Sequence, residues 1–110
     1  MGNGSSFVSK NDSEWKKKSA RALFNAVKEG NAERVEALIK RSVDVNVRDN
    51  NNRTPIMHAV MLDNIEIAKL LVKYGADVNA KDIYGRSVLQ LAEEGSGSLV
   101  EFLKEHGAEY

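Results

Sequence analysis

The chain has 110 residues, enough for one domain and too few for two of ordinary size. Its 16 basic and 16 acidic residues give a formal net charge of zero, which excludes a strong overall field that would draw in nucleic acid, and its 42% hydrophobic content is that of a globular protein. It has no cysteine, no apolar run of the roughly 20 residues that span a membrane, and no secretory signal at its start. We therefore expect a cytoplasmic protein without disulfides or cysteine-ligated metals.

Residues 1–12 predict a flexible arm. They are rich in Gly, Ser and Asn, and beyond Met1 only Phe7 and Val8 are large and apolar, so the segment can bury little surface. The arm also matches the N-myristoylation pattern, with Gly2 as the acceptor and Ser6 at the preferred hydroxyl position.

A lipid anchor at Gly2 would need a second membrane signal, because one myristoyl chain binds membranes only marginally. The absence of cysteine excludes palmitoylation, which leaves a basic segment as the second signal. This membrane-basic segment consists of Lys16, Lys17, Lys18 and Arg21. The first residues are thus interpreted either as a disordered start or as an anchor that makes a cytoplasmic protein membrane-associated.

Residues 13–48 predict a pair of helices. Asp12 or Ser13 can cap the first helix, Gly30 can end it, and Asn31 can cap a second helix over residues 32–41. The apolar sides of the two helices are formed by Trp15, Ala20, Leu23, Phe24 and Val27, and by Val35, Leu38 and Ile39. A helix pair cannot bury such a face within itself, so the next pair must cover it, and Trp15 is interpreted as a core residue.

The clearest unit spans residues 49–81, where Thr54 offers a hydroxyl cap and Pro55 occupies the first helical position, which needs no N–H. Apolar landmarks recur at one constant interval, at Leu23, Ile56 and Leu89 and at Ala26, Ala59 and Ala92. This period predicts a repeat array whose third unit spans residues 82–110. One residue is missing from the third unit, which we place in the turn at residues 95–98, followed by a capping box of Ser98 and Glu101.

These landmarks resemble the ankyrin repeat. The matching residues are Asp49, Thr54-Pro55-Ile56, Ala59, Leu70-Leu71 and Gly75 to Asn79 in the second unit, and Asp82, Gly85, Ser87, Leu89, Ala92, Leu103 and Gly107-Ala108 in the third. The resemblance covers about residues 16–110 and implies an all-α fold. This fold would be a short ankyrin-type α-solenoid of helix-turn-helix repeats with β-hairpin-like loop tips and atypical capping repeats at both ends.

Two residues of the central repeat depart from the ankyrin pattern. Asn52 stands where the hairpin has glycine, and asparagine tolerates the left-handed conformation required there. Met57 stands where the first helix has histidine, so the hydrogen bonds of that histidine are an open question in this repeat.

The sequence does not predict an enzyme, because catalysis needs groups that converge in a pocket. His58 and His106 lie in different units, and Gly95-Ser96-Gly97 is interpreted as a turn between helices rather than a phosphate loop. His58 is expected to be a partly exposed helix residue. We expect no catalytic residue, no metal, no cofactor and no small-molecule substrate.

The resemblance implies a non-catalytic protein-protein interaction module, such as an adaptor, scaffold or inhibitor, that binds through hairpin tips and first helices. The candidate partner-binding residues are Arg48, Asn50, Asn51, Arg53, Met61, Leu62, Lys81, Ile83, Tyr84, Arg86 and Glu94, with Lys28 and Glu29 as counterparts in the first repeat. Apolar residues ringed by basic ones predict a partner with an apolar anchor and acidic surroundings. The alternative is that Met61 and Leu62 pack against a neighbouring helix.

Further interpretations stay open. Nucleic acid is a weak candidate partner, because no base-stacking aromatics accompany the lysine run. Asn46 and Asn79 resemble ankyrin asparagines that are hydroxylated in some cells, and their alternative role is to order loops. The sequence leaves open whether the chain is complete or an excised domain.

Overall fold

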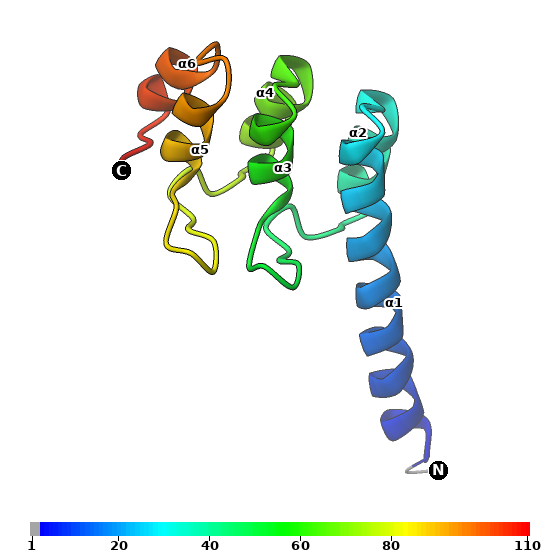
Figure 1. Ribbon diagram of the computed structural model, residues 1–110. Helices are drawn as coiled ribbons and strands as arrows, with labels where there is room; N and C mark the ends of the chain where they lie inside the picture. The colour runs from blue at the N-terminus through cyan, green and yellow to red at the C-terminus, as the bar shows by residue number, and fades with distance from the viewer. Residues whose placement is uncertain (1–2) are drawn as a thin grey trace.

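Three helix pairs stand side by side in a row (Figure 1). The structure is a computed structural model that describes the backbone of residues 3–110 and the side chains of residues 14–110. The helices are α1 (Asn3–Lys28), α2 (Ala32–Lys40), α3 (Pro55–Met61), α4 (Ile65–Lys73), α5 (Val88–Glu94) and α6 (Val100–Glu105). Within residues 3–110 the only β pairing outside the helices is an isolated bridge between Lys81 and Ser87, at the base of one loop tip. The all-helical solenoid expected from the sequence is confirmed.

The first helices of the pairs form one layer and the second helices form another. α3 lies between α1 and α5, and α2 packs on α4. Leu23, Ile56 and Leu89, which occupy the same position in successive repeats, are all buried in the core between these layers. Each pair therefore covers the apolar face of its neighbour, as the repeat period predicts.

The turns within the pairs and the hairpin between them have the left-handed residues and helix caps that the sequence predicts. Gly30 has φ +73° and ends α1, and the Asn31 side chain accepts a hydrogen bond from the N–H of Arg34 at the start of α2. Asn52 has φ +59°, which confirms that it takes the left-handed position of the hairpin. Asn64 caps α4 in the same way as Asn31 caps α2.

The helix cap expected at Asp12 or Ser13 is wrong, because α1 begins at Asn3 and runs through both residues. The flexibility of residues 1–12 stays a prediction, and the backbone from Asn3 onward is helical. Once the α1 segment around Leu23 is fixed by packing, each further residue adds a backbone hydrogen bond at small cost, so the helix propagates toward the N-terminus. The first turns of α1 project past the loop tips (Figure 1).

Two side-chain predictions are also wrong. Trp15 is 49% exposed, because its turn of α1 lies where the helix leaves the stack. The expected capping box of α6 is absent: Leu99 is the N-cap residue without a side-chain hydrogen bond, and the Ser98 hydroxyl instead bonds that of Ser96 at 2.8 Å. The turn of residues 95–99 between α5 and α6 is longer than the turn of residues 62–64 between α3 and α4, so α6 begins past Ser98. Leu99 lies in this turn and is buried.

Candidate functional site

The two hairpin tips between the repeats are built around two equivalent aspartates. Asp49 accepts hydrogen bonds from the N–H groups of Asn51 and Arg53 at 2.9 and 3.0 Å. Asp82, at the same position of the next repeat, accepts from Tyr84 and Arg86 at 2.9 and 3.0 Å. Each carboxylate thus closes its own loop and fixes the direction of the residues at the tip.

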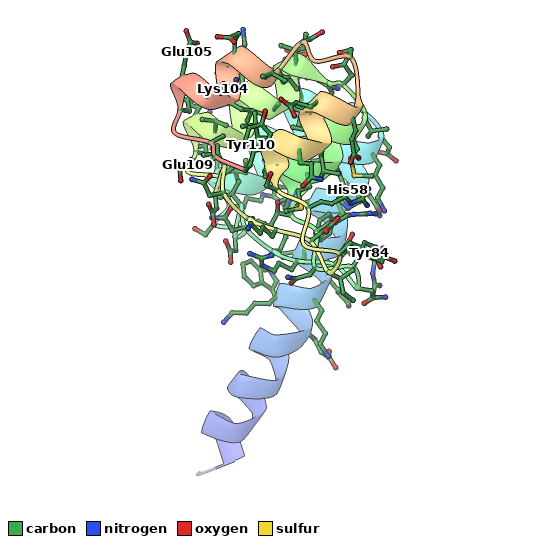
Figure 2. The ribbon with its side chains drawn as sticks, turned by 60° about the vertical axis from the view of Figure 1, so that its left-hand side comes forward. His58, Tyr84, Lys104, Glu105, Glu109 and Tyr110 are labelled. Carbon is green, nitrogen blue, oxygen red and sulfur yellow. The ribbon has the colours of Figure 1, made fainter. Side chains whose placement is uncertain are left out.

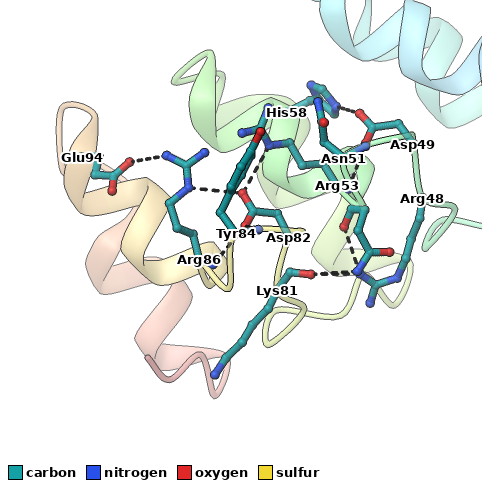
Figure 3. A network of polar contacts seen from close by, with 11 residues as sticks. Arg48, Asp49, Asn51, Arg53, His58, Lys81, Asp82, Tyr84, Arg86 and Glu94 are labelled. Atoms are coloured by element: carbon teal, nitrogen blue, oxygen red, sulfur yellow. Dashed lines mark hydrogen bonds and ion pairs between the residues drawn. The ribbon is translucent and has the colours of Figure 1, made fainter.

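Asp82 also joins the first hairpin tip to the second. Its side chain has no exposed surface, and its Oδ2 lies 3.4 Å from Nε of Arg53 and 3.3 Å from Nε of Arg86 (Figure 3). Arg86 in turn reaches Glu94 on α5 at 3.3 Å. Burial alone raises the pKa of Asp82, but the bonds from the backbone of Arg86 and Tyr84 and from the Arg53 side chain outweigh it and hold this pKa below its ordinary value.

Backbone carbonyls extend this connection along the tips. Arg48 Nη1 donates to the carbonyl oxygens of Asn52 and Lys81 at 3.0 and 3.2 Å (Figure 3). The N–H of Ile83 donates to the carbonyl of Asn51 at 2.9 Å. The tips are therefore hydrogen-bonded to each other and form a continuous, ordered edge.

Four large apolar side chains are exposed, two at the second hairpin tip and two at the end of α3 that is remote from the hairpin. Met61 at the end of α3 is 43% exposed and Leu62 after it is 54% exposed, while Ile83 and Tyr84 at the tip are 61% and 69% exposed. All four are exposed, as predicted. Met61 also lines a recess with Leu91 and Glu94 of α5, so the alternative that it packs against the neighbouring first helix stays open. The Arg86 guanidinium lies 5.5 Å from the centre of the Tyr84 ring and helps to hold it.

The basic rim predicted around these residues is only partly available. Arg53 and Arg86 share Asp82, and Arg86 also pairs with Glu94, so the two positive charges are offset within the protein. Arg48 and Lys81 remain exposed, as do Asn50, Asn51 and Glu94, and at the end of α1 Lys28 and Glu29. The pairing of Arg53 with Asp82 could not be seen in the sequence, because the two residues belong to different repeats and are far apart along the chain.

His58 belongs to the same face and is held from two sides. Its Nε2 lies 2.7 Å from Oδ2 of Asp49, and its ring meets that of Phe24 on α1 edge to face, with centroids 5.4 Å apart. His58 and Tyr84 lie on the same side of the molecule, away from Glu105 and Glu109 (Figure 2). Burial raises the pKa of Asp49, but the bonds from Arg53, His58 and Asn51 outweigh this and lower it.

The buried hydroxyl of Thr54 has no hydrogen-bond partner among the described residues. Met57 is also fully buried. Thr54 is the N-cap residue of α3, but its side chain makes no cap hydrogen bond, so that part of the prediction is wrong. In the third repeat the equivalent Ser87 does accept from the N–H of Gln90, at 3.1 Å.

Asn46 and Asn79 tie each repeat to the next. Asn46 donates to the carbonyl of Gly75 at 3.2 Å and accepts from the N–H of Asp77 at 2.8 Å. Asn79 makes the same pair of bonds with Gly107 and Glu109, at 3.0 and 2.7 Å. These contacts support the loop-ordering role, and hydroxylation of the two asparagines stays a prediction.

Other chemistry has little support in the part of the chain that the structure describes. No group of three or more His, Cys, Asp or Glu side chains among these residues could hold a metal ion. None of the described helices is both long and apolar enough to cross a bilayer. Gly2, the predicted lipidation site, lies outside the described residues, while Lys16, Lys17, Lys18 and Arg21 are exposed on α1.

Comparison with known proteins agrees with this geometry. A family model described as "Ankyrin repeats (3 copies)" matches residues 7–82 and 23–110. The chain belongs to the ankyrin-repeat family, whose members are generally protein-protein interaction modules and typically non-catalytic. No curated protein matches the chain.

Proposed function

We propose that this protein is a non-catalytic adaptor, scaffold or inhibitor that binds a partner protein through its hairpin tips and the exposed side of its first helices. The observation that carries the proposal is the row of exposed apolar side chains at Met61, Leu62, Ile83 and Tyr84. Exposed apolar groups gathered on one surface mark interaction sites, and aromatic side chains contribute most to such interfaces.

The ordered hairpin edge favours this surface over other exposed apolar residues. Asp82 fixes the loop that carries Ile83 and Tyr84, and the bond from Ile83 to Asn51 fixes that loop against its neighbour. A partner therefore meets side chains on an already ordered backbone, which lowers the entropic cost of association.

The test is affinity capture from cells that express the protein, with three forms compared. The wild type and a control carrying Ile65→Asp and Tyr110→Ala, which alter exposed apolar residues away from the tips, should recover the same partner. The variant carrying Met61→Asp and Tyr84→Ala should lose it. Equal recovery by all three folded proteins, with folding checked by circular dichroism, contradicts the assignment of the surface.

A second candidate function, a membrane-tethered form of the same adaptor, draws on the exposed basic residues of α1. At 1.5 Å per residue, Lys16 lies roughly 20 Å along the helix from Asn3. Because surface potentials decay within about 8 Å at physiological salt, Gly2 and the lysines can act on one membrane only if α1 lies along it.

The tethered form is tested by co-expression with an N-myristoyltransferase, mass spectrometry and vesicle sedimentation. Acylated protein should bind anionic vesicles, and binding should fall when Lys16, Lys17 and Lys18 are changed to Gln. An unmodified Gly2 under these conditions contradicts the tethered form and leaves the protein-binding proposal intact.

A further inference from the structure

Charge is distributed along the stack as a gradient, although the whole chain is neutral. Residues 1–41 carry nine basic and five acidic residues, residues 42–81 carry five of each, and residues 82–110 carry two basic and six acidic residues. The three segments thus have net charges of +4, 0 and −4. Because the helix pairs follow one another in a row (Figure 1), an elongated partner on the first helices and tips meets a basic end and an acidic end.

A basic cleft lies at the positive end, between α1 and the first hairpin tip. Its volume is about 390 Å³, and its walls include Lys17, Arg21 and Lys28 of α1 and Arg48 and Asp49 of the hairpin, with Phe24 at its base. Four cations and one carboxylate thus face the same space. The α1 residues recur at spacings of four and seven, which places them on one side of the helix.

The cations of this cleft are not neutralised by the protein around them. Asp49 supplies one negative charge against the four cations, and both its oxygens are already hydrogen-bonded, Oδ1 to the N–H groups of the hairpin and Oδ2 to His58. Among the described side chains Lys17, Arg21 and Lys28 make no ion pair, and Arg48 donates only to backbone carbonyls, through Nη1. This contrasts with Arg53 and Arg86, which are both paired with Asp82.

We infer that this cleft, lined by Lys17, Arg21, Lys28 and Arg48, binds a short acidic segment of the partner protein. The inference rests on the proposed function and adds the chemistry and the direction of the partner. The carboxylates of the partner segment lie beside α1. From there the partner's chain continues along the hairpin edge toward Tyr84. Guanidinium groups of Arg21 and Arg48 receive carboxylates in pairs, while the lysines supply charge.

The charge gradient selects a peptide over other polyanions. A nucleic acid that followed the same surface would carry uniform negative charge past Glu93 and Glu94 of α5 and be repelled there. The only aromatic side chain that lines the cleft, Phe24, is buried against His58, so it offers no ring for a base to stack on. A flat anionic membrane would meet the projecting part of α1 before it reached a recess between α1 and a hairpin (Figure 1).

The probe for this cleft is an acetylated hexaglutamate peptide, with hexaglutamine as its uncharged match, titrated into the full 15N-labelled protein. We expect hexaglutamate to shift the backbone amide signals of residues 17–28 and 48–50, and hexaglutamine to leave them in place. Raising the salt concentration from 50 to 300 mM should weaken binding, because the contacts are ionic.

Two variants with the same change of charge provide the decisive comparison. Lys17→Gln with Arg21→Gln should weaken hexaglutamate binding by about tenfold. Lys40→Gln with Arg41→Gln, exposed residues of the same repeat outside the cleft, should leave the affinity within about twofold of the wild type. All four residues are exposed, so folding should be unaffected, and the thermal midpoint checks this.

Three results would overturn the inference: no shift at the cleft, equal weakening in both variants, or tighter binding at the same amides by a single-stranded oligonucleotide or by phosphatidylserine vesicles. The proposed function is tested separately, because the Met61→Asp and Tyr84→Ala variant retains the cleft. If that variant keeps its partner while hexaglutamate binds as expected, the apolar surface is wrong and the cleft remains. If hexaglutamate does not bind and the variant loses its partner, the cleft inference is wrong and the apolar surface remains.

Discussion

Arg53 and Asp82 lie in successive hairpins and meet through a contact of 3.4 Å between Nε and Oδ2, with the aspartate side chain fully buried. The same carboxylate closes its own loop and pairs with Arg86. One side chain therefore serves the local turn, the stacking of two repeats and the placement of Tyr84. Because of these roles, substitution of Asp82 should disturb the hairpin tips strongly.

Replacing this aspartate should destabilise the protein more than any substitution of an exposed carboxylate. We expect Asp82→Asn to lower the free energy of unfolding by about 2–4 kcal/mol, because the largely buried Arg53 loses its counter-charge and Arg86 keeps only the exposed Glu94. Urea denaturation followed by circular dichroism measures the change. Glu101→Gln, an exposed substitution with the same loss of charge, is the control, and an equal midpoint for the two variants would contradict the role of Asp82.

The protein should also lose stability in acid. The pKa values of Asp49 and Asp82 are lowered in the folded state, so below the ordinary value of about 3.9 the unfolded chain binds more protons than the folded one. Stability contributed by these groups is present above that pH and is lost as the pH falls through the folded pKa values. Unfolding in urea at pH 7, 5, 4 and 3 should show this decline.

Asp49→Asn provides the matched comparison for the acid effect. It removes one of the two carboxylates, so the free energy of unfolding should fall less steeply between pH 5 and 3 than in the wild type. An identical slope in the variant would show that other groups cause the acid sensitivity.

The orphaned hydroxyl of Thr54 gives a prediction of opposite sign at two equivalent positions. Thr54→Val should leave stability unchanged or raise it by up to about 1 kcal/mol, because it removes a buried oxygen that has no described hydrogen-bond partner. Ser87→Ala should lower stability by about 1 kcal/mol, because the Ser87 hydroxyl accepts from the N–H of Gln90. Thermal and urea unfolding of both variants decide the matter, and a loss at Thr54 as large as that at Ser87 would mean that its hydroxyl is satisfied.

The asparagine ties between repeats should contribute measurably to stability. Asn46→Ala removes two hydrogen bonds that bridge the first and second repeats, so we expect a loss of about 1–2 kcal/mol. Asn51→Ala, an exposed hairpin residue whose backbone makes its described bonds, should change stability by less than about 0.5 kcal/mol. Equal effects of the two substitutions would remove the special role of Asn46.

Local signals in the sequence predicted most of the fold. The constant repeat period placed Leu23, Ile56 and Leu89 in the core, and Pro55, Gly30 and Asn31 marked helix ends, because helix ends depend on residues within one turn of each other. The start of α1 was missed because helix propagation depends on what is already ordered rather than on the composition of the segment itself. Ser98 failed as a cap because the turn between α5 and α6 is the longer one and α6 begins past Ser98.

The site was predictable in its apolar residues and not in its charges. Met61, Leu62, Ile83 and Tyr84 were assigned to the surface because stacking leaves those repeat positions uncovered, and they are exposed. Which cations stay available depends on pairs that are distant in the sequence. Asp82 and Glu94 pair with Arg53 and Arg86. Arg21 and Lys28 of α1, placed beside Arg48 only by folding, have no acidic partner among the described side chains.

The inter-repeat bonds occur at two levels of the stack. Asn46 bonds to the loop after α4, and Asn79 bonds to the loop after α6. Arg48 and Arg53 link the two hairpin tips. Because the repeats are hydrogen-bonded at both levels, the stack should resist both twisting and bending. The binding surface should therefore keep one shape with and without its partner, and association should proceed in a single bimolecular step without a slower rearrangement.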